Sequence, residues 1–333
     1  MGVGMELAER GLVPRFLERW AIRALCARRL SDVTRAGGVE AFLERLEGSR
    51  IAEVPELANT QHYEVPSGFF GLVLGRQRKY SSAYWPVGVS TLDEAEEAML
   101  ELTCRRADLR DGQEILELGC GWGSLSLSMA RRYPAARIAA VSNSASQRAF
   151  IESHDLPNLR VLTADMNDFH PDGVFDRVVS VEMFEHMRDW RRLLERVAGW
   201  LRADGRLFLH VFCHRTHAYT FEGEGDANWM GRHFFSGGIM PSHDLVRRTA
   251  PDALAVEEDW WLDGRHYQRT AAAWGRNLEA RRGEVLHVLR GHYGDEAERW
   301  FHRWRLFFLA CEELFGFDEG RQWGVGHYQL RRR

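Results

Sequence analysis

The chain has 333 residues, of which 44 are basic and 48 acidic, and its formal net charge is −4. Its 45% hydrophobic and 28% charged residues lie near the average of globular proteins, which excludes a disordered or fibrous chain. The charge balance lacks the basic excess of a nucleic-acid binder, and no window holds the ~18 uncharged apolar residues of a membrane-spanning helix.

The N-terminal part, residues 1–75, is predicted to be mainly helical. The apolar residues of its first helix fall near helical spacing, with arginines between them: Leu7, Leu12, Phe16, Trp20, Ile22 and Leu25. We expect this face to pack on its own protein, with contact with a membrane surface as the alternative. We interpret residues 1–90 as a helical cap region and residues 91–333 as the main domain.

From Thr91 the chain alternates between helices and short apolar strands. Thr91 and Glu94 form a capping-box pattern that begins the first of these helices. The strands are predicted at residues 114–118, 137–141, 159–163, 177–181 and 206–212. Helices are predicted between them at residues 123–132, 144–153 and 190–201. This alternation predicts a doubly wound, mostly parallel α/β sheet.

The remainder of the chain is predicted to hold a lid, two helices and a last strand. The stretch 213–243 is rich in His, Gly, Phe and Trp with weak periodicity, which is typical of a lid over a substrate. Helices at about 272–289 and 296–315 follow, and the alternating segment 322–330 is expected to be the last strand. The histidines here and just before lack the tight spacing of metal ligands, so we expect no metal: His210, His214, His217, His233 and His243.

A glycine loop gives the first chemical signal. Gly119-Cys120-Gly121-Trp122-Gly123 follows the strand EILEL and opens into a helix, so that backbone N–H groups can approach a ligand closely. A dinucleotide fingerprint would read GxGxxG with an acid about 20 residues further on. Here the third glycine comes one position early, and the next strand ends Val141-Ser142-Asn143 without a carboxylate. The loop therefore indicates a nucleotide site that does not bind NAD.

The loop ELGCGWG resembles motif I of class I S-adenosylmethionine (SAM) methyltransferases. Further motifs accompany it in order: Lys79-Tyr80-Ser81, TLDEA at 91–95, EMFEH at 182–186, FCHRTHAYTFE at 212–222 and FFSGGIMPS at 234–242. The series resembles the cyclopropane-fatty-acid synthase superfamily, and within it the plant coclaurine-type N-methyltransferases of benzylisoquinoline alkaloids.

The resemblance implies a Rossmann-like class I fold with an antiparallel last strand and SAM as cofactor. It also implies cofactor contacts from Tyr80, Ser81, Glu117, Gly119, Gly121, Gly123, Asn143, Gln147 and Asp165.

Two branches of this superfamily act on different acceptors. The lipid-modifying members commonly carry Cys after the Tyr-Ser pair and Gly in place of the first Glu of EMFEH, and they hold a bicarbonate ion that removes a proton. This chain has Ser82 and Glu182 at those positions, but it retains Glu185, His210 and Tyr267, which match other positions of that site. The departures favour N-methylation. A cyclopropane-fatty-acyl-phospholipid synthase-like activity and SAM binding without turnover are the alternatives.

An amine acceptor gives the EMFEH residues a chemical purpose. An alkylammonium with a pKa of ~10 is protonated at pH 7, and recovering its lone pair costs roughly 4 kcal/mol. We expect His186 to act as general base, Glu185 to orient it or share the proton, and Glu182 to anchor the ammonium.

Aromatic faces attract alkylammonium groups, so part of the aromatic content is assigned to the acceptor site. Substrate contacts are predicted for Phe212, His214, Tyr219, Phe221, Trp229, Phe234 and Tyr267. The helically spaced Trp300, Trp304, Phe307, Phe308 and Phe315 are predicted to be mostly core.

The remaining expectations concern partners and location. The expected partner is a small aromatic or cyclic amine, and a homodimer is left open. The five cysteines are scattered and form no CxxC pair, which favours reduced thiols in a cytoplasm.

Overall fold

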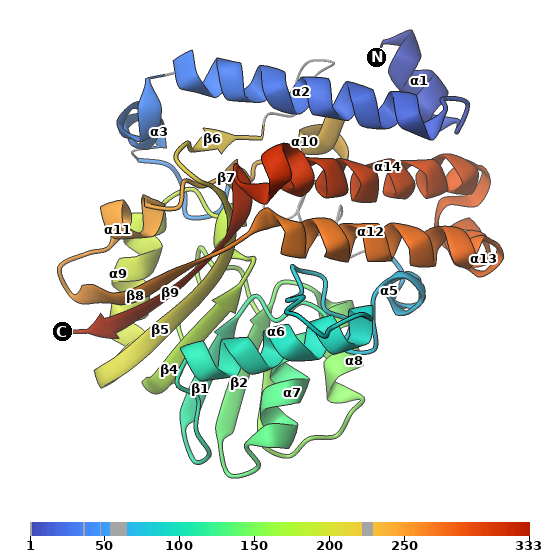
Figure 1. Ribbon diagram of the computed structural model, residues 1–333. Coiled ribbons are helices and arrows are strands. Elements are labelled where there is room, and N and C mark those ends of the chain that lie inside the picture. Colours follow the sequence, from blue (N-terminus) through green and yellow to red (C-terminus); the bar gives the residue numbers. More distant parts are fainter. Residues whose placement is uncertain (1, 36, 47, 54–64, 222–228) are drawn as a thin grey trace.

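The computed structural model describes residues 2–35, 37–46, 48–53, 65–221 and 229–333, and it contains a twisted seven-stranded sheet (Figure 1). The strand order is β3-β2-β1-β4-β5-β9-β8. The strands are β1 (Glu114–Leu118), β2 (Arg137–Ser142), β3 (Leu159–Thr163), β4 (Phe175–Val181), β5 (Leu201–His214), β8 (Leu254–Leu262) and β9 (Trp323–Arg332).

The first five strands of the sheet are mutually parallel, and β9 runs antiparallel to both of its neighbours, β5 and β8. The predicted doubly wound sheet with an antiparallel last strand is confirmed. The strand β8 was not predicted. It lies at the edge of the sheet, and its sequence LAVEEDWWL carries consecutive acidic residues where one face is open.

Helices cover both faces of the sheet. On one face lie α6 (Leu92–Arg106), α7 (Ser124–Arg132) and α8 (Ala145–Glu152), packed through apolar side chains such as Leu100, Met129 and Phe208. On the other lie α3 (Gly38–Leu46), α9 (Trp190–Trp200) and α11 (Leu245–Thr249). The predicted capping box at Thr91 and Glu94 begins α6.

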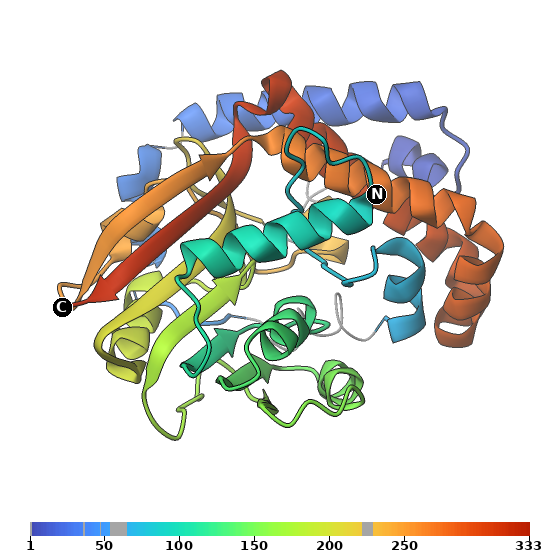
Figure 2. The ribbon, with the colours of Figure 1, turned by 60° about the horizontal axis from the view of Figure 1, so that its bottom comes forward.

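A layer of helices lies over one end of the sheet (Figures 1 and 2). It consists of α1 (Val3–Glu9), α2 (Arg15–Arg35), α5 (Ser67–Val73), α12 (Gly264–Ala280), α13 (Arg282–Tyr293) and α14 (Ala297–Gly316). The single helix predicted at 272–289 is therefore two helices, separated at Arg281. Among the residues described, no helix is long and apolar enough to cross a membrane.

The N-terminal helix α2 packs on its own protein, against α14, and only part of the predicted face is used: Ile22 packs against the core, whereas Phe16 is exposed. Buried Glu18 accepts hydrogen bonds from Arg305, and Arg19 pairs with Glu312 at 2.8 Å. Trp20, from the predicted apolar face, is 71% exposed. Charged pairs therefore hold this helix, and contact with a membrane surface or with a second copy stays a prediction.

The stretch predicted as a lid contains short elements. The strand β6 (Tyr219–Thr220) pairs antiparallel with β7 (Ile239–Met240), and α10 (Trp229–His233) precedes β7. The described residues also contain the 3-10 turns η1 (Phe184–His186), η3 (Gly294–Glu296) and η4 (Phe317–Gly320). Glu222 of the motif FCHRTHAYTFE lies outside the described residues, and both the lid and the domain boundary near residue 90 stay predictions.

Candidate active site

The predicted site residues gather at the carboxyl ends of the parallel strands. Gly119 follows β1, Asn143 follows β2, Asp165 comes shortly after β3, and Glu182 follows β4. The strand order reverses at β1, and open α/β sheets bind their ligands at this kind of switch point. The topology therefore brings four separate segments of the chain to one edge.

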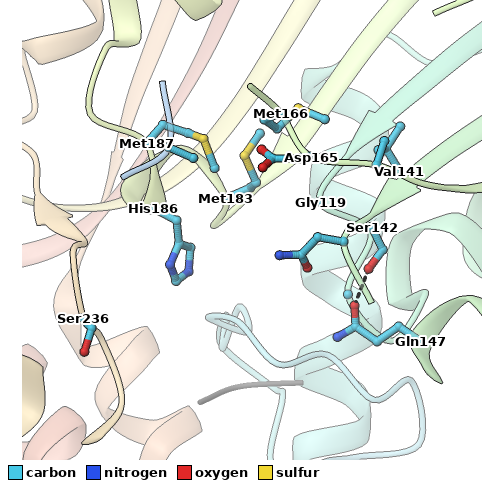
Figure 3. A pocket seen from close by; sticks show the side chains of 14 residues that line it. Gly119, Val141, Ser142, Gln147, Asp165, Met166, Met183, His186, Met187 and Ser236 are labelled. Atoms are coloured by element: carbon cyan, nitrogen blue, oxygen red, sulfur yellow. Dashed lines mark hydrogen bonds between the residues drawn. The ribbon is translucent and has the colours of Figure 1, made fainter. Parts of the chain in front are cut away.

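Two adjoining cavities lie at this edge and share Gly119, Gly121 and Gln147. The first, called here the Asp165 cavity, is also lined by Asn143 and Asp165 (Figure 3). The second, called the Glu117 cavity, is also lined by Tyr80, Ser81, Glu117 and Glu182. In Figure 3 the imidazole of His186 lies across the Asp165 cavity from Gln147.

The three glycines of the loop have different surroundings. Gly119 has φ +78°, and a Cβ there would lie 2.6 Å from the Met183 side chain. Gly123 also has φ +78°, but a Cβ there would meet Ile151 of α8 at 2.6 Å, and Gly123 lines neither cavity. Gly119 and Gly121 thus border the cleft, whereas Gly123 allows close packing of α7 on α8.

Several buried donors in these cavities have no hydrogen-bond partner within the described part of the chain. They are Gln147 Nε2, Ser124 Oγ and Trp122 Nε1. The side-chain oxygen of Gln147 is held by Ser142 Oγ at 2.7 Å, which directs the amide nitrogen away from this contact. Buried donors are nearly always paired in folded proteins. The cleft therefore fits a polar ligand rich in acceptors, such as the adenosyl and carboxylate parts of SAM.

Two buried ionisable groups lie beside the Glu117 cavity. Glu117 is 2% exposed, and burial raises the pKa of its carboxyl to about 7, although the Ser126 hydroxyl donates to it. Lys79 is also buried, and burial lowers the pKa of its ammonium to about 8. Its Nζ donates to Ser82 O at 2.7 Å and to Ser81 Oγ, so it fixes the loop that carries Tyr80 and Ser81.

A third cavity, called the aromatic cavity, adjoins the first two and has a volume of about 100 Å³. Its aromatic lining consists of Tyr80, Phe212, Phe221, Phe235, Tyr267, Trp274, Phe307 and Phe315. Glu182 is the sole carboxylate in the described lining, which contains no Lys or Arg. His186 also lines the Asp165 cavity, and Tyr80 and Glu182 also line the Glu117 cavity. These three side chains therefore stand where the cavities meet.

Glu182 is held by donors from three separate segments. Its Oε1 accepts from the Ser82 N–H at 2.9 Å and from His210 Nε2 at 3.1 Å, and its Oε2 accepts from the Tyr267 hydroxyl at 2.7 Å. Its backbone φ is +47°, a strained value for a residue with a side chain. Burial raises the pKa of the carboxyl, and the Lys79 ammonium opposes that effect. The surrounding donors thus hold the carboxylate in one position.

His186 and Glu185 differ in their access to the cavities. The His186 ring packs on Phe235 with a centroid distance of 4.6 Å, and burial lowers its pKa to about 4. The imidazole is therefore neutral at pH 7. The same burial weakens it as a proton acceptor, and the Glu182 carboxylate opposes that effect. Glu185 is fully buried and lines none of the three cavities.

The carboxyl group of Glu185 is only partly hydrogen bonded. Its Oε1 accepts from the Phe212 N–H at 2.6 Å, while Oε2 has no hydrogen-bond partner in the described residues. Burial and the neighbouring Glu182 raise its pKa well above the ordinary value.

The aromatic cavity contains some of the predicted substrate residues and not others. Phe212, Phe221 and Tyr267 line it. Phe234 does not line it and stacks behind its wall on Phe307, at 4.4 Å between centroids. His214 also lies outside the lining, where its Nδ1 accepts from the backbone N–H groups of residues 216 and 217.

Four aromatic walls of this cavity were not among the predicted site residues: Phe235, Trp274, Phe307 and Phe315. The last two were assigned to the core, because helical spacing predicts burial and does not distinguish a core residue from the wall of a cavity. An outer cavity of about 320 Å³ lies next to it, between α2, α10 and α14. The two share Phe221, Met230 and Leu314. Tyr219 and Trp229, predicted as substrate contacts, line the outer cavity only.

Comparisons with known proteins agree with this geometry. Residues 53–321 match the family model described as mycolic acid cyclopropane synthetase. The chain is 35% identical to an (S)-coclaurine N-methyltransferase of Thalictrum flavum subsp. glaucum, over 98% of this chain and 94% of that protein. It is 25% identical to a cyclopropane-fatty-acyl-phospholipid synthase of Escherichia coli (strain K12), over 84% of this chain and 71% of that protein.

A solved structure is similar to nearly the whole molecule. A coclaurine N-methyltransferase bound to N-methylheliamine and S-adenosylhomocysteine (SAH) superposes with a TM-score of 0.94 and 34% identity, and the match covers 98% of each chain.

Proposed function

The chain belongs to the mycolic acid cyclopropane synthetase family, and we propose that within it this protein is a SAM-dependent methyltransferase that acts on the nitrogen of a small cyclic or aromatic amine. The observation that carries the choice of an amine is the aromatic cavity. A cavity with aromatic walls, one carboxylate and no described cation suits an alkylammonium, which gains about 0.5–2 kcal/mol from aromatic faces.

The residues of the two cofactor-side cavities fit SAM. The unpaired donors of Gln147, Ser124 and Trp122 would serve its acceptor groups, and Glu117 would face its positive charge. Asn143 and Asp165 border the same cleft and are proposed to hold the ribose and adenine. When bound, SAM supplies the electrophilic methyl group.

The chain's own residues bind the amine, orient it and take its proton. Glu182 attracts the ammonium with a carboxylate whose position is already fixed by three donors. His186, neutral at pH 7, accepts the proton that the nitrogen must lose. The nitrogen lone pair then attacks the methyl carbon, and the electron pair of the broken C–S bond stays on sulfur. The buried, unpaired Oε2 of Glu185, one residue away, is proposed to stabilise the charged imidazole.

The lipid-modifying alternative fits these residues less well. The lipid branch implies a bicarbonate ion among residues matching Ser82, His210 and Tyr267, yet here those three groups all donate to the Glu182 carboxylate. A free anion at the same donors would meet a second buried negative charge. The site therefore does not fit bicarbonate, and no step is derived through that ion.

An acceptor screen with labelled SAM tests the proposal. Transfer of label to secondary or tertiary cyclic amines, with none to vesicles of unsaturated phospholipid, is the expected result. Transfer to the vesicles alone would establish the lipid alternative. Glu182→Gln should raise the KM of the amine at least tenfold and leave SAM binding within twofold, since the neutral amide no longer attracts an ammonium.

The cellular location is a separate proposal. All five cysteines are free in the structure, which supports a reducing compartment such as the cytoplasm.

A further inference from the structure

A series of hydrogen bonds between side chains connects Glu182 with the end of helix α6. His210 Nε2 lies 3.1 Å from Glu182 Oε1, and His210 Nδ1 lies 2.9 Å from His327 Nε2. His327 Nδ1 lies in turn 2.8 Å from an Nη of Arg106. Two imidazoles and three hydrogen bonds thus lead from a guanidinium on α6 to the carboxylate in the aromatic cavity.

The fold places these groups in line. His210 of β5 and His327 of β9 are directly opposite partners in the antiparallel register, and their rings lie 4.6 Å apart between centroids. Both are fully buried, and His327 is directed toward the end of α6 by its contact with Arg106. Arg106 is the last residue of α6 and lies over the Trp260 ring at 4.6 Å.

The direction of every hydrogen bond in this chain is determined by the arginine. A guanidinium only donates, so His327 Nδ1 must be the bare, accepting nitrogen. His327 then carries its proton on Nε2 and donates it to His210 Nδ1. His210 in turn must carry its proton on Nε2 and donate it to Glu182 Oε1. Burial lowers the pKa of both imidazoles well below the ordinary value, which agrees with one proton on each ring.

We infer that Arg106 and His327 are positioning residues that, through His210, keep Glu182 an ionised acceptor for the substrate ammonium. The inference rests on the proposed function for the role of Glu182. Because Oε1 always receives an N–H from His210, a proton that reaches Glu182 can reside only on Oε2, beside Tyr267. This series of hydrogen bonds ends at the Arg106 guanidinium, which cannot accept a proton. It therefore stabilises the Glu182 anion and offers no path along which the substrate's proton could leave.

Other groups also act on Glu182. The Lys79 ammonium, the Ser82 N–H, the Tyr267 hydroxyl and a protonated His186 favour its anion, and Glu185 opposes it when ionised. None of these contacts fixes which nitrogen of His210 carries the proton. Arg106 does so, because it excludes the reversed pattern in which both imidazoles carry an Nδ1 proton and a protonated Glu182 donates to a bare Nε2 of His210.

The test combines histidine tautomers with a pH profile. In protein labelled with ¹⁵N-histidine, NMR should show His210 and His327 both protonated on Nε2, their signals being assigned by loss in His210→Gln and His327→Gln. Arg106→Met should change this pattern of protonation. It should also lower kcat/KM for the amine about tenfold and move the acid limb of the pH profile of kcat/KM upward by about one pH unit. Arg106→Lys, which still donates, should restore most of the activity.

A matched control is available on the same helix. Arg105→Met removes the neighbouring exposed arginine, whose nearest acid is Glu101 at 3.7 Å, and should leave both tautomers and profile unchanged. An Nδ1 proton on either wild-type imidazole overturns the inference, as does a slower Arg106→Met enzyme with an unshifted profile. The tautomers are read without turnover, so failure to find any amine acceptor would refute the proposed function and leave this inference to be decided by NMR.

Discussion

Replacing Glu117 by Gln should make the free protein more stable and its binding of SAM weaker. The carboxyl is 2% exposed, the Ser126 hydroxyl donates a hydrogen bond to it, and burial raises its pKa from 4.5 to about 7. The folded state therefore binds this proton more tightly than the unfolded chain does, and the free energy of unfolding falls as pH rises from about 4.5 to 7. At pH 8 the buried, ionised Glu117 lowers the free energy of unfolding by about 3 kcal/mol, relative to the protein at a pH below 4.5.

Denaturant unfolding and calorimetry measure the two effects. At pH 8 and without SAM, Glu117→Gln should raise the free energy of unfolding by about 1–3 kcal/mol, and at pH 5 the gain should disappear. SAM carries positive charge that stabilises the ionised carboxylate. Wild-type affinity for SAM should therefore rise up to about eightfold between pH 6.0 and 7.5, and the affinity of the variant should stay flat.

Glu96 provides the matched control. Burial raises the pKa of its carboxyl to about 7 as well, but it accepts from the Gly75 and Gln77 N–H groups and lines neither cofactor-side cavity. Glu96→Gln should alter the pH dependence of stability in the same window and keep the wild-type pH dependence of SAM binding. The reasoning is refuted if Glu117→Gln is no more stable than wild type at pH 8, or if its affinity for SAM still rises with pH.

Three further substitutions test the packing of the loop, the base and the outer cavity. Gly123→Ala should lower the free energy of unfolding by about 1–3 kcal/mol, because the position has φ +78° and the added Cβ meets Ile151; Gly199→Ala in α9, with open space around it, should not. His186→Asn should reduce kcat at least about 100-fold at pH 7 in a labelled-methyl assay, with the Kd of SAM within twofold; a smaller loss would remove His186 as the base. Met230→Trp, at the junction of the aromatic and outer cavities, should spare compact amines and lower kcat/KM about tenfold for amines with a second apolar arm, and equal losses for both kinds would contradict a continuous acceptor site.

The sequence predicted the sheet because its buried parallel strands are continuous apolar runs with glycine or polar residues at their ends. The strand β8 escaped prediction because an edge strand needs no such run, and Glu257 and Glu258 interrupt its pattern. The packed face of helix α2 was predicted only in part, because periodicity records only apolar residues. Its packed side is held by ion pairs such as Glu18 with Arg305, and the partner arginine is distant in sequence.

Sequence patterns also fail to record contacts between distant residues at the candidate active site. EMFEH and the glycine loop pointed to Glu182, His186 and Gly119, which line the cavities, because these residues lie in short motifs that follow recognisable strands. The groups that hold Glu182 come from residues 82, 210 and 267, and only the fold brings them to one carboxylate. A sequence pattern names residue types, whereas the direction of a hydrogen bond depends on a neighbour that no local pattern contains.

The arrangement of charge explains why a methyltransferase for amines needs this burial. An ammonium and a sulfonium repel each other, so the amine must lose its proton close to the cofactor for the methyl group to be transferred. In the proposed mechanism Glu182, held by three donors, draws the ammonium in, and burial keeps His186 uncharged until the proton arrives. If either group faced water, solvent would screen the attraction and the imidazole would take its proton from bulk. The aromatic walls therefore do more than bind the substrate, because by excluding water they make the proton transfer depend on the residues around Glu182.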